Sequence, residues 1–109
     1  MTKIYTGKIG RYKGGDGLDI TIMTGEVAFA PSWDLVRKAK KNKISREEYK
    51  KEYLRLMRES FIKNREIWDW VLSQNELTFL CYCPSGKFCH RILLAYIFEK
   101  LGAEYMGER

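Results

Sequence analysis

The residues best suited to chemistry gather in one short segment near the C-terminal end of the chain. Residues 81–90 contain all three cysteines and the only histidine, namely Cys81, Cys83, Cys89 and His90. Thiolates act as nucleophiles and metal ligands, and imidazole serves as a general base or as a ligand. The apolar run before them predicts a buried strand that leads through a Pro-Ser-Gly loop into a helix. Because ligands of open α/β sheets bind at the carboxyl ends of strands, we expect a functional site here.

An anion is the ligand that suits this loop best. The start of a helix offers unpaired backbone amides and the positive end of the helix dipole. A hydroxyl, an ammonium and a guanidinium group in the same segment would add hydrogen bonds to a phosphate or carboxylate. The predicted ligand-binding residues of the segment are Ser85, Gly86, Lys87, His90 and Arg91. Candidates for stacking on a base are Tyr12, Trp33 and Tyr82, with core packing as the other interpretation of Trp33.

Cysteine catalysis is a second interpretation of the segment. A cysteine at a helix start beside a cation is an activated nucleophile, which makes Cys83 and Cys89 the candidate catalytic residues. Seven residues separate Cys83 from Arg91 and one separates Cys89 from it, so neither spacing matches the loop of cysteine phosphatases. A third interpretation makes the cysteines small buried hydrophobic residues, as cysteines outside disulfides often are.

A metal site is a further alternative. Its potential ligands are Cys81, Cys83, Cys89 and His90, but their spacing is not that of a common zinc knuckle or ribbon. Neighbouring residues of a helix project about 100° apart, so we expect Cys89 and His90 to share one metal ion poorly. The sequence therefore predicts no metal or other cofactor, with zinc as the alternative.

Length and composition indicate one globular domain over residues 1–109. Hydrophobic residues make up 45% of the chain, which is enough for one ordinary core. The apolar run at residues 92–98 is far too short to cross a bilayer, and the N-terminal residues lack the apolar stretch of a leader. An odd number of closely spaced cysteines argues against a disulfide framework. We expect a cytoplasmic protein without a membrane partner.

The patterning of the chain predicts several strands. Alternating apolar residues indicate strands at residues 3–9 and 18–23, and the glycines of residues 14–17 suit the tight turn of an N-terminal hairpin. A short strand is expected at residues 27–30. Residues 77–83 are apolar on both faces, as in a strand that is covered on both sides, and residues 103–106 predict an edge strand.

Capping signals and apolar stripes predict the helices. Ser32 suits the N-cap of a helix that begins at Trp33, and Ser45 with Glu48 forms a capping box before a second helix. The apolar stripe of that helix runs on to residue 72 with a break near Asn64, and residues 90–101 predict a largely buried helix. The expected architecture is a single compact α/β domain, with a mainly parallel sheet, an N-terminal hairpin and helices on both faces.

Residues 37–51 carry the whole net charge of +6, because eight basic and two acidic side chains lie there. Such a cluster can bind a polyanion without sequence specificity, so nucleic acid is an alternative partner. The candidate residues for this contact are Lys38, Lys40, Lys41 and Lys43. A solvated helix surface is the competing interpretation of the same charges.

The stretches at residues 29–33, 77–91 and 101–109 resemble those of a known family. They are similar to small phage-encoded members of the YeaO-like family of unknown function, over essentially the whole chain. The resemblance implies a compact α/β fold with a mainly parallel sheet. It also implies a role in host takeover or counter-defence in the host cytoplasm. Phage relatives often carry the label uroporphyrinogen-III C-methyltransferase, but this chain has no glycine-rich cofactor loop after its first strand.

Together these features predict a protein that holds a nucleotide-like or other phosphorylated small molecule at the cysteine-rich strand-loop-helix site. In a phage setting, such a protein would sequester a nucleotide signal. The alternatives are a cysteine-dependent enzyme acting on such a molecule, and non-specific binding of nucleic acid through residues 37–51. A second copy of the chain is a further candidate partner.

Overall fold

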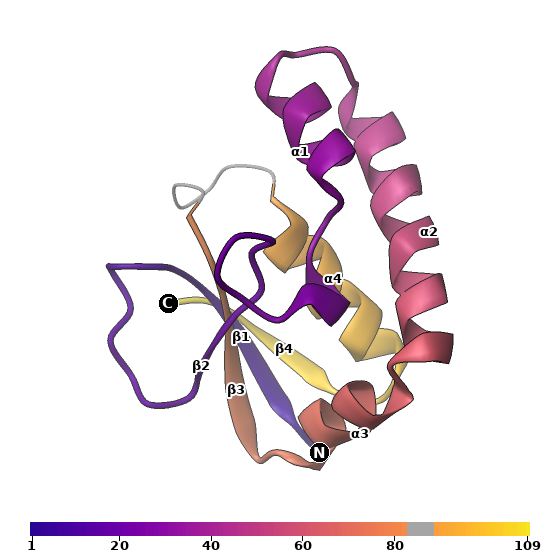
Figure 1. Ribbon diagram of the computed structural model, residues 1–109. Coiled ribbons are helices and arrows are strands. Elements are labelled where there is room, and N and C mark those ends of the chain that lie inside the picture. The colour runs from indigo at the N-terminus through magenta and orange to yellow at the C-terminus, as the bar shows by residue number, and fades with distance from the viewer. Residues whose placement is uncertain (83–88) are drawn as a thin grey trace.

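A parallel β-sheet forms the centre of the protein (Figure 1). The computed structural model describes residues 1–82 and 89–109, and within them the sheet has four strands in the order β2-β3-β1-β4. The strands are β1 (Lys3–Lys8), β2 (Gly17–Asp19), β3 (Glu76–Cys81) and β4 (Glu104–Glu108). Every pairing between these strands is parallel, which confirms the predicted α/β class and its mainly parallel sheet. The predicted site residues Cys83, Ser85, Gly86 and Lys87 lie outside the described residues.

The helices follow the start signals in the sequence. In the described chain they are the 3₁₀ helix η1 (Val27–Phe29), α1 (Trp33–Lys40), α2 (Arg46–Lys63), α3 (Arg65–Ser73) and α4 (His90–Lys100). Ser32 caps α1 by accepting a hydrogen bond from the Leu35 amide, and Ser45 with Glu48 forms the predicted capping box of α2. None of the helices among the described residues has the length and apolar character needed to cross a bilayer.

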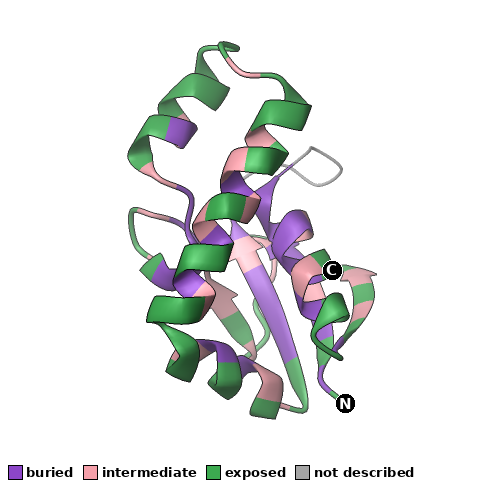
Figure 2. Cartoon of the chain, turned by 90° about the vertical axis from the view of Figure 1, so that its right-hand side faces the viewer, coloured by how far each residue is buried: buried purple, intermediate pink, exposed green. Residues whose placement is uncertain are grey.

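The core lies between the sheet and the helices. The register pairs Thr6 with Phe79, so both side chains lie on the face that the helices cover. Phe79 packs there in a cluster with Phe29, Trp68 and Phe98, all fully buried. Trp68 stacks on Phe98 with ring centroids 4.8 Å apart, and Phe29 contacts Trp68 edge-on at 5.0 Å. Figure 2 shows this buried layer behind the exposed outer surfaces of the helices.

A loop and the last residue of the chain, rather than helices, cover the opposite face of the sheet. The Arg109 guanidinium carbon lies 3.4 Å from the ring centroid of Tyr5, and Nη1 donates to Asp16 at 3.0 Å and to Thr78 at 3.1 Å. Figure 1 shows residues 9–16 on this side and the labelled helices on the other. The expectation of helices on both faces is therefore wrong for the described chain, because residues 9–16 are too few for a crossover helix.

The expected N-terminal hairpin is also wrong. Strands β1 and β2 do not pair with each other, because each pairs in parallel with β3. Strand β3 is buried on both faces. Its position between β1 and β2 gives the backbone groups at both of its edges hydrogen-bond partners. Glycine-rich residues 14–17 permit a tight turn but do not require one. A short strand was expected at residues 27–30, but Val27–Phe29 form η1, which Glu26 caps by accepting a hydrogen bond from the Ala28 amide.

Ser60 of α2 provides a test of this packing. Its buried hydroxyl donates to the Ala28 carbonyl at 2.5 Å and accepts from the Trp68 indole nitrogen at 3.1 Å. We expect Ser60→Ala to lower the free energy of unfolding by about 1–3 kcal/mol, because two buried polar groups lose their partner. Urea denaturation measures the change. The control is Ser73→Ala at the exposed end of α3, where an equal loss would contradict the assignment.

Candidate functional site

A cavity of about 590 Å³ opens at the edge of the sheet where β2 and β3 end. Its described walls come from residues 21–23 after β2, from α1, from the start of α2, from the end of β3 and from the start of α4. This is the carboxyl edge of a parallel sheet, at which α/β proteins bind ligands. The volume lies within the range of pockets that hold small organic ligands and cofactors.

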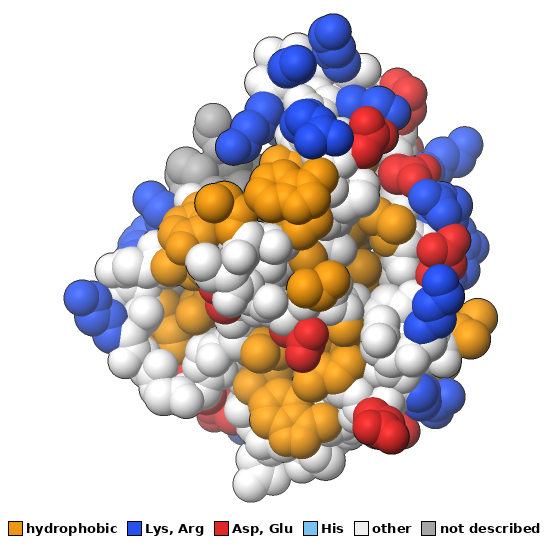
Figure 3. Space-filling view, viewed as in Figure 1, with side chains coloured by type: hydrophobic (Ala, Val, Ile, Leu, Met, Phe, Trp, Pro, Cys, Tyr) orange, Lys and Arg blue, Asp and Glu red, His pale blue; other side chains and the backbone are white. Residues whose placement is uncertain are grey.

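Aromatic and cationic side chains occupy different parts of the cavity wall. Trp33 and Tyr82 line the cavity although they are 48% and 54% exposed, and Tyr49 lies deeper. Lys40 and Arg46 bring positive charge to the rim where α1 ends and α2 begins. Figure 3 shows a hydrophobic patch directly below a cluster of basic side chains at the α1–α2 end of the molecule. The cavity can therefore accept a ligand with one flat apolar part and one anionic part.

Two thiols and an imidazole form the floor of the cavity. The Cys81 and Cys89 side chains are buried, and their Sγ atoms lie 2.7 Å apart. The Cys89 Sγ lies 3.5 Å from Nδ1 of His90. The other ring nitrogen, Nε2, lies 2.9 Å from the carbonyl oxygen of Ile20, which can only accept a hydrogen bond. This contact assigns the proton of the neutral ring to Nε2 and directs Nδ1 towards the thiols.

Burial keeps His90 in its neutral form. Desolvation is the largest influence and holds the pKa of His90 below its ordinary value, although the neighbouring Cys81 raises it. Cys89 is the N-cap of α4 and has extended backbone angles, with φ −152° and ψ 152°. The argument from helical spacing against a shared metal ion therefore fails, because Cys89 is not a helical residue. The donor atoms of Cys81, Cys89 and His90 lie within 4.8 Å of one another.

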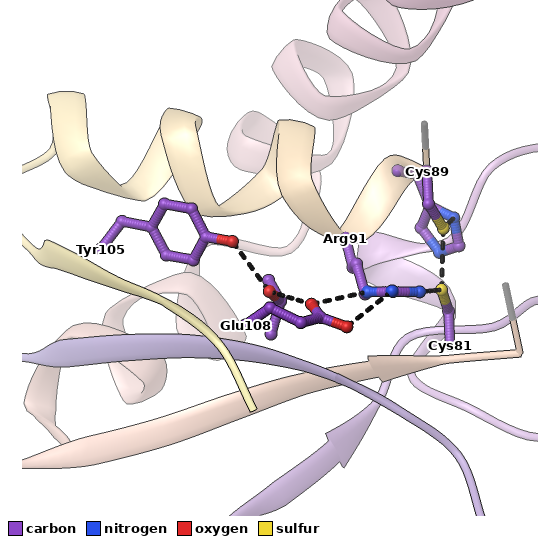
Figure 4. Close-up of polar contacts among 7 residues, drawn as sticks. Cys81, Cys89, Arg91, Tyr105 and Glu108 are labelled. Carbon is purple, nitrogen blue, oxygen red and sulfur yellow. Dashed lines mark hydrogen bonds and ion pairs between the residues drawn. The ribbon is translucent and has the colours of Figure 1, made fainter. Parts of the chain in front are cut away.

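Arg91 lies beside this floor as a fully buried cation. Its Nε and Nη2 donate to the two carboxylate oxygens of Glu108 at 3.2 and 2.8 Å, and Nη1 donates to Cys81 Sγ at 2.8 Å (Figure 4). Burial lowers the pKa of Arg91, but the hydrogen bonds to Glu108 and Cys81 outweigh it and hold the pKa above its ordinary value. Arg91 is not among the described residues that line the cavity. Its contact with a ligand stays a prediction.

The partners of Arg91 on β4 were missed by sequence reasoning. Thr6 donates to Glu108 at 2.5 Å, and the Tyr105 hydroxyl lies 2.8 Å from the Thr6 hydroxyl oxygen. Figure 4 shows these groups as one chain of contacts from Tyr105 to Cys89. Residues 103–106 predicted an edge strand, but no local pattern indicated that Glu108 pairs with Arg91.

The structure brings together some of the predicted site residues and separates others. Trp33, Tyr82, Cys89 and His90 all line the cavity. Tyr12 lies on the opposite face of the sheet, where its hydroxyl contacts Arg109 and Asp16. Of the candidate nucleic-acid residues, Lys38 forms an exposed ion pair with Asp34 at 3.1 Å, and Lys40 lines the cavity. Lys41 and Lys43 are exposed at the same end.

The fold and the cavity define a small parallel α/β protein with thiols, an imidazole, aromatic rings and cations around one cleft. Residues 27–102 match the family model DUF488-N3a, described as the active DUF488-N3 subclade, and the chain belongs to this family. The match includes the cavity-lining residues from Pro31 to His90, whereas Glu108 lies beyond it. No curated protein and no solved structure matches the chain.

The ion pair between the buried Arg91 and the partly exposed Glu108 yields a stability prediction. We expect Arg91→Met to lower the free energy of unfolding by about 1.5–3 kcal/mol, because Glu108 and Cys81 then lose their hydrogen bonds to a charged group. Adding Glu108→Leu should recover part of that loss, since the remaining charge is also removed. Chemical denaturation of the single and double variants measures both effects. The control is Arg55→Met in an exposed ion pair of α2, which should change stability little. A loss at Arg91 as small as at Arg55 would contradict this role.

Proposed function

We propose that the protein binds a nucleotide-like or other aromatic phosphorylated small molecule in the cavity. The observation that carries the proposal is the pairing of exposed aromatic rings with cations around one cleft of about 590 Å³. The position at the carboxyl edge of a parallel sheet supports it, because that edge is where such folds hold nucleotides. Membership of the DUF488-N3a family does not identify a ligand or a substrate.

The base would stack on the aromatic wall. Trp33 begins α1 and Tyr82 follows β3, so two separate elements present their rings to the same cleft. Trp33 is about half exposed, so much of its large apolar surface contributes no burial free energy to folding. Contact with the flat face of a base would bury that surface, and every base offers such a face.

The phosphate would lie at the basic rim. Lys40 ends α1, and Arg46 is the first residue of α2, so two cationic side chains from separate helices reach the same rim. Their positive charges favour an anion there. The α1–α2 junction is an additional candidate for the anion site, whereas Ser85, Gly86 and Lys87 of the loop after β3 lie outside the described residues and stay a prediction.

We also propose a biological setting for this binding, in which the protein is phage-encoded. We infer that the protein acts in a host cytoplasm and lowers the free concentration of a nucleotide signal by binding it. A sequestering protein needs a fitted pocket and no turnover, and the aromatic and cationic walls meet that need.

A second candidate is an enzyme that modifies the same ligand through a thiol. The contact of Cys89 Sγ with His90 Nδ1 at 3.5 Å and the description of the subclade as active favour it. A general base beside a thiol is the arrangement that activates cysteine nucleophiles. Chromatography of the bound nucleotide after prolonged incubation separates the candidates, since an enzyme would release an altered product and Cys89→Ser would not.

Ligand binding is tested with a thermal-shift screen of mononucleotides, dinucleotides and cyclic nucleotides, followed by calorimetric titration of the compounds that stabilise the protein. We expect Trp33→Ala to weaken binding by roughly 5- to 150-fold, the equivalent of about 1–3 kcal/mol for one stacked base. Lys40→Ala should also weaken nucleotide binding relative to the unaltered chain, and it should reduce the dependence of the affinity on salt.

The chain offers a matched control for this experiment. Trp70 of α3 is 44% exposed and is not among the described residues that line the cavity, so Trp70→Ala should leave the affinity unchanged. The proposal fails if none of the nucleotides stabilises the protein, or if Trp70→Ala weakens binding as much as Trp33→Ala does.

A further inference from the structure

We propose that Cys81, Cys89 and His90 form a binding site for a thiophilic divalent cation, with zinc as the expected ion. The site lies at the floor of the cavity, where the described residues supply three ligands. This inference goes beyond the binding of a nucleotide-like ligand, because metal binding requires no other ligand to be present.

Convergence of three suitable donors is the first argument. Cys81 is the last residue of β3, Cys89 is the N-cap of α4, and His90 is the first residue of that helix. The three donor atoms lie within 4.8 Å of one another. The three residues are 1%, 2% and 7% exposed, so the donors are held in fixed positions away from bulk water. Two thiolates and one imidazole are a ligand set that suits zinc and other soft cations.

The distances allow a tetrahedral ion after a small movement. Zinc bonds of about 2.3 Å to sulfur and about 2.0 Å to nitrogen place neighbouring donors roughly 3.5–3.8 Å apart. The separation of 3.5 Å between Cys89 Sγ and His90 Nδ1 already meets this requirement. The two sulfur atoms, at 2.7 Å, would have to move apart by about 1 Å. That separation is also longer than the bond of about 2.05 Å in a disulfide.

The surroundings prepare the donors for a metal ion. The Ile20 carbonyl accepts a hydrogen bond from Nε2 of His90, which leaves the Nδ1 lone pair on the side of the thiols. Histidines that bind metal ions are usually oriented in this way by a backbone carbonyl or a carboxylate. On the other side, the Arg91 guanidinium donates a hydrogen bond to Cys81 Sγ at 2.8 Å, as Figure 4 shows, and so holds this sulfur atom in place beside Cys89.

The three described donors lie beside the cavity. Cys81, Cys89 and His90 all line it, so an ion bound by them would lie next to the space proposed for the small molecule. Three protein ligands occupy three positions of a tetrahedral zinc ion, and the fourth takes water, a substrate group or a further protein ligand. Cys83, the fourth ligand considered from the sequence, lies outside the described residues.

The test is metal analysis of the purified protein together with titration of the metal-free protein with CoCl₂. We expect about one equivalent of zinc after purification under reducing conditions, and a cobalt spectrum with thiolate-to-metal charge transfer and the intense visible bands of a tetrahedral ion. Competition with a chromophoric chelator should show at least a tenfold loss of zinc affinity in Cys81→Ser, Cys89→Ser and His90→Gln.

Tyr96→Phe is the matched control, because Tyr96 lies on the exposed side of α4, is not among the described residues that line the cavity and has no donor in the cluster. It should retain the zinc content and the cobalt spectrum of the unaltered chain. The inference is overturned if the unaltered chain binds neither ion, if its cobalt spectrum lacks sulfur charge transfer, or if the three ligand variants keep the affinity of the control. It is equally overturned if peptide mapping of thiol-blocked lysate finds Cys81 and Cys89 joined as a disulfide. The spectrum of the unaltered chain decides the matter even where a variant does not fold.

Discussion

The buried guanidinium of Arg91 is the constraint on which the site depends. Arginine keeps its proton inside a protein, so the charge can be buried only where every element around it supplies an acceptor. Glu108 of β4 and Cys81 of β3 do so, and this fixes the first turn of α4 against two strands at once. The same turn carries Cys89 and His90, so the floor of the cavity is positioned by an ion pair that lies outside it.

One-sided packing of the helices explains why a cavity exists. The aromatic cluster around Trp68 fills the space between the sheet and the lower parts of α2, α3 and α4. Helix α1 packs against α2, and the short strand β2 forms one edge of the sheet. A gap therefore remains between the α1–α2 junction and the ends of β2 and β3. Its walls come from elements with different surfaces, one basic and one apolar.

The family match and the cavity concern the same part of the molecule. The region shared with the DUF488-N3a model begins before Trp33 and ends after α4, so it spans the aromatic wall, the basic rim and the thiol floor. The proposed ligand and the proposed cation would use different groups of this cleft. Rings and cations would hold the ligand, whereas sulfur and imidazole would hold the ion. The proposal of a nucleotide-like ligand and the proposal of a bound cation can therefore be tested independently, although an ion at the floor would lie beside the ligand.

The sequence by itself determined the types of most elements, their caps and the concentration of chemistry at the junction of β3 and α4. These features depend on residues within a few positions of one another, such as Ser45 with Glu48. It did not determine the order of the strands, the loop in place of a second helical layer, or the acidic partner of Arg91. Those depend on contacts between distant segments, as between Arg109 and Asp16 across the sheet. Only the tertiary structure decided them, because a buried charge or a strand edge accepts any suitable partner that the whole chain can bring to it.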